Sequence, residues 1–217
     1  MEPIVARPIV TRFRKLYEQV TIPLGYLCLR AGLTPDMLTL LSLSLGGLAA
    51  YVIAQSAFLS GILLILLMSF VDTLDGATAR AGGTANSYGT LFDHVSDRYA
   101  EFLLLLGMML SGVVAPSWAM FALFGMVMAS YVRARAESSG KVASCDVGFA
   151  GRAEKLTLLI IGMGLQAFFL RVHILQWAVI AVGVLSHITA IQRLLYARRV
   201  ILGDQASRRL RKRQGMV

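Results

Sequence analysis

Residues 58–80 read FLSGILLILLMSFVDTLDGATAR, an apolar run that ends in a segment with two aspartates. The run from Phe58 to Val71 is almost entirely apolar, and with the residues that follow it reaches the roughly 20 residues that a membrane-spanning helix requires. Asp72 and Asp75 interrupt the end of the run. A charged side chain inside a membrane helix costs roughly 2.5–3.5 kcal/mol, so such residues persist where they bind ions, form pairs or line a watery cavity. The stretch therefore predicts a membrane helix that ends in a functional site.

The rest of the chain has the same apolar character. Of its 217 residues, 57% are hydrophobic, and the mean hydropathy is +0.68, whereas soluble domains are about 45–50% apolar. The predicted fold class is an all-α integral membrane protein, with an N-terminal amphipathic juxtamembrane helix over residues 9–30. Six transmembrane helices are expected, over residues 36–54, 58–79, 88–113, 117–137, 149–170 and 174–196.

A single membrane domain is expected over residues 1–217, because the sequence contains neither a repeat nor a recognisable second soluble domain. It divides into a juxtamembrane segment (1–34), a six-helix transmembrane core (35–199) and a basic cytoplasmic tail (200–217).

The basic residues set the orientation of the predicted spans. Of the 21 Lys and Arg residues, 20 fall on the side that holds both termini and the loops after the second and fourth spans, and Arg171 alone falls on the other. The positive-inside rule therefore places both termini and the active site in the cytoplasm of a multi-pass cell-membrane protein. The net charge of +9 is explained by this topology. Nucleic-acid binding is disfavoured, because no aromatic-interleaved basic patch accompanies the charge.

Four of the 12 acidic residues fall in the second and third predicted spans. Asp72 and Asp75 are three residues apart, and Asp93 and Asp97 are four apart, so each pair shares one face of its helix. The connection over residues 81–87 is short and polar, which makes the two helices antiparallel neighbours and lets the four carboxylates converge at their cytoplasmic ends. Oxygen ligands without His or Cys at ligand spacing favour Mg²⁺ or Mn²⁺ over zinc.

Small residues lie beside these aspartates. Gly76 and Ala79 follow Asp75, and Gly89 precedes Asp93 by one turn. Small residues in membrane helices commonly allow close helix packing, and for any one of these three residues packing is the alternative explanation. Beside metal ligands they also let a bulky substrate approach the helix backbone, and the set as a whole favours this second role.

The order of these residues resembles the signature of the CDP-alcohol phosphotransferase family. The chain reads DTLDGATAR over residues 72–80; eight residues then separate Arg80 from Gly89, three separate Gly89 from Asp93, and three separate Asp93 from Asp97. Every fixed position of the signature is present at its required spacing. The six spans with a preceding surface helix also resemble that family, so the resemblance covers nearly the whole chain. It implies an enzyme that transfers a phosphate-linked group from a CDP-activated donor to an alcohol.

The resemblance also implies a role for each signature residue. Asp72, Asp75 and Asp93 would hold two divalent ions, Mg²⁺ or Mn²⁺, against the donor pyrophosphate. Asp97 would help to bind metal and would deprotonate the acceptor hydroxyl as general base, so Asp93 and Asp97 are the expected catalytic residues. The CDP moiety of the donor would lie against Gly76, Ala79, Arg80, Gly89, Thr34 and Pro35.

A group of basic residues falls at the cytoplasmic ends of the last three predicted spans, namely Arg133, Arg135, Arg152, Lys155 and Arg193. Cations on three helix ends favour a pocket for an anion, since Arg side chains suit phosphate; topology or snorkelling is the alternative for each residue. The phosphatidylinositol-phosphate synthase branch, and archaeal relatives with ether-lipid donors, are similar over residues 131–140 and 148–156. In that branch such residues bind the phosphate of inositol phosphate. This chain departs from it in having Arg133 where Lys is usual.

The expected reaction is therefore transfer of a phosphatidyl-type group from CDP-diacylglycerol or CDP-archaeol to inositol phosphate, with release of CMP. Glycerol 3-phosphate is the alternative acceptor, since it also carries a phosphate. The expected partners are the CDP-linked lipid, a small phosphorylated alcohol, membrane lipids and, by resemblance, a second copy of the chain in a homodimer. A divalent-cation or organic-anion transporter is a further alternative, but transporter sites lie near the midplane and often between repeated halves. A structural membrane scaffold would leave four costly carboxylates unexplained.

Overall fold

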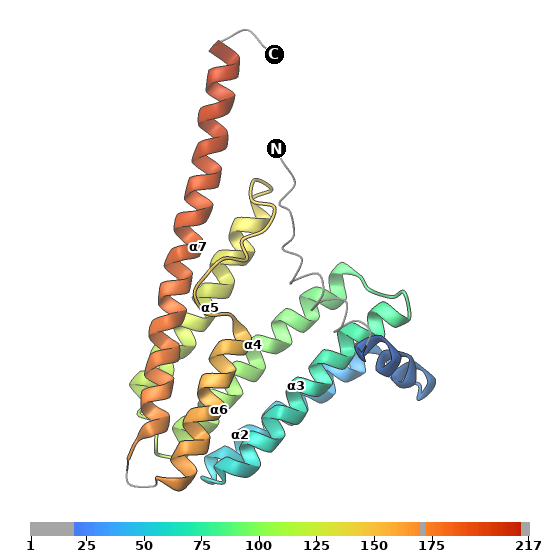
Figure 1. Ribbon diagram of the computed structural model, residues 1–217, viewed down its shortest axis with the longest axis vertical. Coiled ribbons are helices and arrows are strands. Elements are labelled where there is room, and N and C mark those ends of the chain that lie inside the picture. The colour runs from blue at the N-terminus through green and yellow to red at the C-terminus, as the bar shows by residue number, and fades with distance from the viewer. Residues whose placement is uncertain (1–19, 170–171, 214–217) are drawn as a thin grey trace. The chain divides into compact units, whose positions relative to one another are not determined.

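The computed structural model describes residues 20–169 and 172–213, with side chains described as far as Gly203. Over these residues the chain is helical, which confirms the predicted all-α class. A short helix, Val20–Arg30, precedes α2 (Pro35–Ala54), α3 (Phe58–Ala81), α4 (Ser87–Leu110), α5 (Pro116–Ser138), α6 (Arg152–Phe168) and α7 (Ile174–Arg213) (Figure 1). Residues 9–19 of the expected juxtamembrane helix and Arg171 lie outside the described residues.

The chain divides into two compact units. The first unit comprises the chain up to residue 53 together with residues 60–104, and so contains α2 and most of α3 and α4. The second unit comprises residues 54–59 and the chain from residue 105 onward, and so contains α5, α6 and α7.

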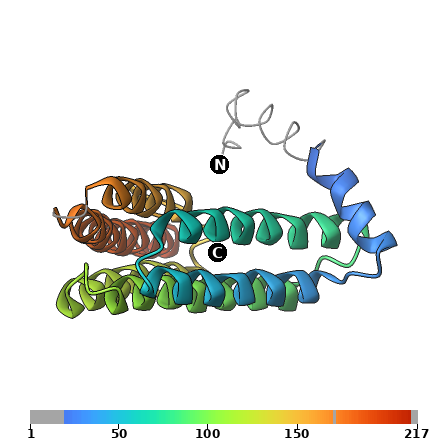
Figure 2. The same cartoon turned by 90° about the horizontal axis from the view of Figure 1, so that it is seen from below.

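Three helices of the first unit, α2, α3 and α4, run alongside one another (Figure 2). Ala49 and Ile53 of α2, Ile65 of α3 and Leu104 of α4 are buried, each with no more than 2% of its surface exposed. The helix Val20–Arg30 packs against the C-terminal end of α3. A Cβ at Gly25 would lie 2.6 Å from the carbonyl oxygen of Ala77, so only glycine permits this approach.

In the second unit, α7 packs along both α5 and α6. The ring of His187 on α7 stacks on Phe121 of α5, with ring centroids 4.5 Å apart, and its Nε2 atom lies 3.3 Å from the Phe121 carbonyl oxygen. His187 therefore has a structural role in joining α5 to α7.

Four helices of the described residues are long and apolar enough to cross a membrane: α2, α3, α5 and α7 as far as Gly203. Helix α4 has 24 residues, a length of about 36 Å, but it carries four charged side chains between Asp93 and Glu101. Helix α6 has 17 residues and is about 25 Å long, less than the roughly 30 Å of a hydrocarbon core. The chain is thus a multi-pass membrane protein. Four of the six expected spans are both long enough and apolar enough to cross a membrane.

Three predicted spans have a bound that differs by three or more residues from the helix in the structure. The third span was placed over residues 88–113, but α4 ends at Leu110. The fifth span was placed over residues 149–170, but α6 begins at Arg152, because the residues before it form a loop bonded to α7: the Phe149 N–H donates to Oε1 of Gln192 at 2.9 Å. The sixth span was placed over residues 174–196, but α7 continues to Arg213. The expected tail from residue 200 is therefore helical as far as it is described.

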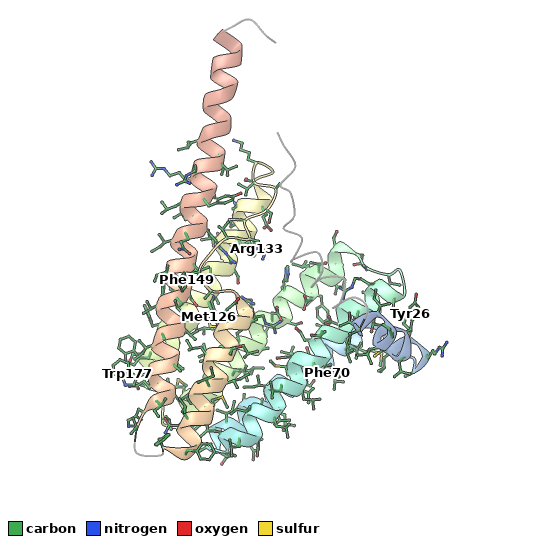
Figure 3. The ribbon with its side chains drawn as sticks, viewed as in Figure 1. Tyr26, Phe70, Met126, Arg133, Phe149 and Trp177 are labelled. Carbon is green, nitrogen blue, oxygen red and sulfur yellow. The ribbon has the colours of Figure 1, made fainter. Side chains whose placement is uncertain are left out.

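Large apolar side chains project from the outer faces of several helices (Figure 3). Phe70 of α3 is 51% exposed and Trp177 of α7 is 67% exposed. Leucines accompany Phe70 along α3, including Leu63 at 68% exposed. Contiguous exposed apolar surface of this kind marks contact with a membrane or a partner, and lipid tails are its natural environment in a multi-pass protein.

Candidate active site

Helices α3 and α4 bring three of the predicted metal ligands together. Asp72 and Asp75 lie on α3 and Asp93 lies on α4, and each offers a carboxylate oxygen within 4.8 Å of the other two. Asn86 fixes the start of α4, since its side-chain oxygen accepts a 2.8 Å hydrogen bond from the Gly89 N–H in the manner of a helix N-cap. Asp93 thus lies close to Asp72 and Asp75 because the connection between α3 and α4 is short and the start of α4 is fixed by its cap.

These oxygens fit a divalent cation. Two oxygens on opposite sides of one Mg²⁺ ion lie about 4.2 Å apart, because each Mg–O bond is 2.0–2.1 Å long. All three oxygens lie within 4.8 Å of one another, so the group is compact enough for its members to share one ion. The ligand set is carboxylate only, which suits Mg²⁺ or Mn²⁺.

Asp97 lies one turn further along α4 than Asp93. It is buried, with 7% of its surface exposed, and its Oδ2 atom lies 3.8 Å from Nη2 of Arg98. The same Arg98 nitrogen lies 2.9 Å from Oε1 of Glu101. Asp97 therefore shares its environment with a basic and an acidic neighbour, and it is not among the three carboxylates whose oxygens lie within 4.8 Å of one another.

A cleft of about 440 Å³ opens beside these carboxylates, within the first unit. It is lined by the loop before α2, the first turn of α2, the end of α3, the connection between α3 and α4, and the start of α4. The lining residues are Thr34, Pro35, Asp36, Thr39, Asp75, Gly76, Ala79, Arg80, Thr84, Ala85, Asn86, Gly89, Thr90 and Asp93.

All six residues that the resemblance assigned to the CDP moiety line this cleft, although they come from three separate parts of the chain. Thr34 also caps α2, since its hydroxyl oxygen accepts a 3.3 Å hydrogen bond from a backbone N–H one turn later, and Pro35 occupies the first helical position, where its missing N–H costs nothing. At Gly89 a Cβ would meet only Asn86 Oδ1, at 3.8 Å. The glycine therefore leaves its backbone open to the cleft.

Thr39 is one of several polar lining residues that the sequence did not predict. Thr39 of α2 lines the cleft, and its hydroxyl donates a 2.6 Å hydrogen bond to Oδ2 of Asp75. The two residues are 36 positions apart, and a single threonine in an apolar helix gives no pattern that points to a carboxylate on another helix.

The predicted basic residues belong to the second unit, where two of them meet. Arg133 lies on α5 (Figure 3). Its Nε donates to Oε1 of Glu137 and its Nη1 donates to Oδ1 of Asp146, at 3.2 Å in each case. Nη2 of Arg193 on α7 lies 3.9 Å from the same Asp146 oxygen. Two guanidinium groups from different helices thus converge on one carboxylate.

Arg193 also organises the loop between α5 and α6. It is buried, with 9% of its surface exposed, and it donates from Nε to the Val147 carbonyl at 2.9 Å and from Nη1 to the Ala129 carbonyl at 2.8 Å. The Glu137 carboxylate accepts a 2.9 Å hydrogen bond from the Cys145 N–H in the same loop. Glu137 and Arg193 therefore attach the loop over residues 139–151 to α5 and α7.

The other three predicted basic residues have different surroundings. Arg135 is exposed, and its Nη1 donates to Ser138 on its own helix at 3.4 Å. Arg152 and Lys155 lie in the first turn of α6, where Arg152 is half-buried and Lys155 is 7% exposed. Their use in a common anion pocket stays a prediction.

Similarity to known proteins covers most of the chain. The chain is 32% identical over 191 residues to an archaetidylinositol phosphate synthase of Pyrococcus horikoshii, and the aligned region covers 88% of this chain and 97% of that protein. It is also 32% identical over 194 residues to a phosphatidylinositol phosphate synthase of Mycolicibacterium smegmatis, covering 83% of this chain and 84% of that protein.

Two solved structures share the fold. The crystal structure of Mycobacterium tuberculosis phosphatidylinositol phosphate synthase with CDP-DAG bound has a TM-score of 0.74 and 28% sequence identity, over 82% of this chain and 94% of that one. The structure of the same synthase with manganese and citrate has the same TM-score and identity, over 82% and 88% of the two chains.

The family model described as CDP-alcohol phosphatidyltransferase matches residues 32–190. This range contains every residue that lines the cleft and all four aspartates of the signature. The chain therefore belongs to the CDP-alcohol phosphatidyltransferase family.

Proposed function

We propose that this enzyme transfers the phosphatidyl-type group of a CDP-linked lipid, CDP-diacylglycerol or CDP-archaeol, to inositol phosphate and releases CMP. Its family gives the chemistry of a CDP-alcohol phosphatidyltransferase, and the names of its relatives support a phosphorylated inositol as acceptor. The observation that carries the proposal is the cleft of the first unit, where Asp75 and Asp93 share one cavity with the backbone of Gly76 and Gly89.

The cleft is suited to the CDP part of the donor. Its volume of about 440 Å³ falls within the range of sites for small molecules and cofactors. Gly76, Ala79 and Gly89 would let the nucleotide approach the helix backbones, Thr34 and Pro35 would form the opposite wall, and Arg80 would face the phosphates. The lipid tails would remain among the exposed apolar side chains of the helices.

The four aspartates would hold two divalent ions, Mg²⁺ or Mn²⁺. When bound, the ions offset the negative charge of the donor pyrophosphate and of the departing CMP. The chain contributes the placement of the ligands, because α3 and α4 bring Asp72, Asp75 and Asp93 together.

Asp97 would act as the general base, with Asp93 beside it. Its carboxylate takes the proton of the acceptor hydroxyl as that oxygen forms a bond to the phosphorus of the phosphatidyl group. The bond from this phosphorus to the bridging pyrophosphate oxygen breaks, and CMP leaves with the electron pair. The burial of Asp97 keeps bulk water away from the proton transfer.

The phosphate of the acceptor would bind to basic residues of the second unit. Arg133 and Arg193 support this assignment, because both already hold an anionic group in the Asp146 carboxylate. Arg135, Arg152 and Lys155 complete the proposed set. Glycerol 3-phosphate remains the alternative acceptor, because its phosphate offers the same charge. The family's chemistry leaves the transporter alternative without support.

In the membrane, we place six helices across the bilayer, with both termini and the active site in the cytoplasm. The distribution of basic residues supports this orientation, and the length of α4 allows it to span despite its charged first half. A homodimer stays a prediction from the family resemblance, which cross-linking in native membranes would test.

The test is CMP release by the purified protein in detergent with Mg²⁺ or Mn²⁺. CDP-diacylglycerol and CDP-archaeol would each be combined with inositol phosphate, glycerol 3-phosphate, inositol or serine, one acceptor at a time. We expect release with inositol phosphate and its loss on addition of a chelator. Release with glycerol 3-phosphate alone would keep the chemistry and overturn the proposed acceptor.

A further inference from the structure

The hydrogen bond between Thr39 and Asp75 joins two helices at the wall of the cleft. Thr39 is 4% exposed and Asp75 is 7% exposed, and their side-chain oxygens lie 2.6 Å apart. Both residues line the cleft beside Asp93. A short, buried hydrogen bond fixes the orientation of the carboxylate that accepts it.

The conformation of Thr39 is itself constrained. Its Oγ1 atom also lies 3.2 Å from the carbonyl oxygen of Pro35, four residues earlier in the same helix, a contact typical of threonine in helices. A hydroxyl has one proton to donate, and the shorter distance assigns it to Asp75. The Pro35 carbonyl is thus a weaker competitor for this proton, and the few rotamers open to a β-branched side chain in a helix keep the hydroxyl within reach of the carboxylate.

We propose that Thr39 is a positioning residue for the metal site: by binding Oδ2 of Asp75, it turns the carboxylate so that its remaining electron pairs face Asp72 and Asp93. The inference rests on the proposed use of these aspartates as metal ligands. Groups that hydrogen-bond to a metal ligand orient it and sustain the affinity of the site. Thr39 orients Asp75 from α2, and the first turn of α2 also lines the cleft. One side chain therefore connects the part of the cleft proposed to bind the nucleotide with the proposed metal ligands.

The decisive variant is Thr39→Val, which keeps the shape of the side chain and removes the donor. Binding of Mn²⁺ would be measured from the loss of the free-ion electron paramagnetic resonance signal, with protein free of donor and acceptor. We expect the dissociation constant to rise about 10- to 100-fold. Thr39→Ser retains the hydroxyl and is expected to bind Mn²⁺ within a few-fold of the unmodified protein.

Ser42→Ala is the matched control on the same helix. Ser42 is also 4% exposed, and its hydroxyl donates to the Thr39 carbonyl at 2.9 Å, away from the aspartates. Its removal deletes a buried hydroxyl without touching a carboxylate, so Mn²⁺ affinity should be unchanged. Thermal unfolding of both variants in detergent would report any general loss of structure.

A double variant tests whether Thr39 acts through Asp75. If it does, Thr39→Val adds no further loss of Mn²⁺ affinity in an Asp75→Asn background, because the two residues form one interacting unit. Wild-type affinity in Thr39→Val, or an equal loss in Ser42→Ala, would overturn the inference. The measurement needs no turnover, so a failure of the proposed reaction and a failure of this inference would be seen separately.

Discussion

The Nη1 atom of Arg133 lies 3.2 Å from Oδ1 of Asp146, which ties α5 to the loop that follows it. Because Arg193 approaches the same oxygen at 3.9 Å, the carboxylate sits between two guanidinium groups that we assign to the acceptor phosphate. A phosphate that binds there has to displace Asp146 or share the arginines with it. The side chain of Asp146 is 69% exposed, so it is free to move toward solvent.

Asp146→Asn should therefore strengthen binding of the acceptor. Exposed ion pairs contribute roughly 0.2–1 kcal/mol, so we expect the KM for inositol phosphate to fall by up to about five-fold, while the KM for the CDP-linked donor stays constant as the internal control. Steady-state CMP release at several acceptor concentrations provides both values. A higher acceptor KM would instead mean that Asp146 orients the arginines for the acceptor.

Arg193→Ala should damage the enzyme more severely than Arg135→Ala. The first variant removes two hydrogen bonds from a charged donor to carbonyls, each contributing roughly 1.5–3 kcal/mol, whereas the second removes an exposed contact with Ser138. We expect faster tryptic cleavage after Lys141, in the loop that Arg193 anchors, and at least a ten-fold loss of turnover. Equal cleavage rates in the two variants would contradict the anchoring role of Arg193.

Gly89→Ala tests the cleft as the donor site. The added methyl group would meet only Asn86 Oδ1, at 3.8 Å, so the midpoint of thermal unfolding should not change while the KM for the CDP-linked donor rises several-fold. Gly25→Ala is the contrasting variant, because its methyl group would lie 2.6 Å from the Ala77 carbonyl oxygen. It should lower the unfolding midpoint. An unchanged donor KM in Gly89→Ala would place the nucleotide elsewhere.

Asp97→Asn should abolish CMP release and spare much of the Mn²⁺ binding. The amide cannot take a proton from the acceptor, while Asp72, Asp75 and Asp93 still offer their oxygens to a cation. Activity and Mn²⁺ binding would be measured on the same preparation. Retained turnover would remove the proposed role of Asp97 as base, and a complete loss of Mn²⁺ binding would make it chiefly a ligand.

The two cysteines should differ in reactivity. Cys145 is fully buried, its thiol lies 3.7 Å from the Arg193 carbonyl oxygen, and burial raises its pKa. Its thiolate fraction at pH 8 is therefore lower than that of an ordinary thiol, and access is blocked as well. Cys28 is partly exposed, so we expect it to be alkylated at least ten-fold faster, as peptide mass spectrometry would record. Similar rates in the folded protein would contradict the burial of Cys145, and denaturant should abolish the difference.

The first unit shows why parts of the site were predictable from the sequence. The spacing of Asp72 and Asp75, and of Asp93 and Asp97, fixes which residues share a helix face. The short connection then brings the two helices together, as the proximity of Asp72, Asp75 and Asp93 confirms. Thr39 could not be found in this way, because nothing in the sequence says which face of α2 meets α3.

The second unit shows what such reasoning misses. Residues 149–151 are apolar or small and were predicted to be part of a span, but the Phe149 N–H binds Gln192 instead of joining a helix. Nothing in the sequence distinguishes Asp146 and Glu137 from the other acidic residues, yet both bind Arg133. These roles depend on contacts between distant parts of the chain, which periodicity and composition do not encode.

The length of α6 has a consequence for the bilayer. In the six-span arrangement, a helix of 17 residues is about 5 Å shorter than the hydrocarbon core that it crosses. The bilayer beside it has to become thinner, or headgroups and water have to reach down to its first turn. The half-buried Arg152 would then meet water at a depth where α7, packed alongside, is still surrounded by acyl chains. A water-soluble molecule can therefore approach the first turn of α6 at a depth that acyl chains would otherwise occupy.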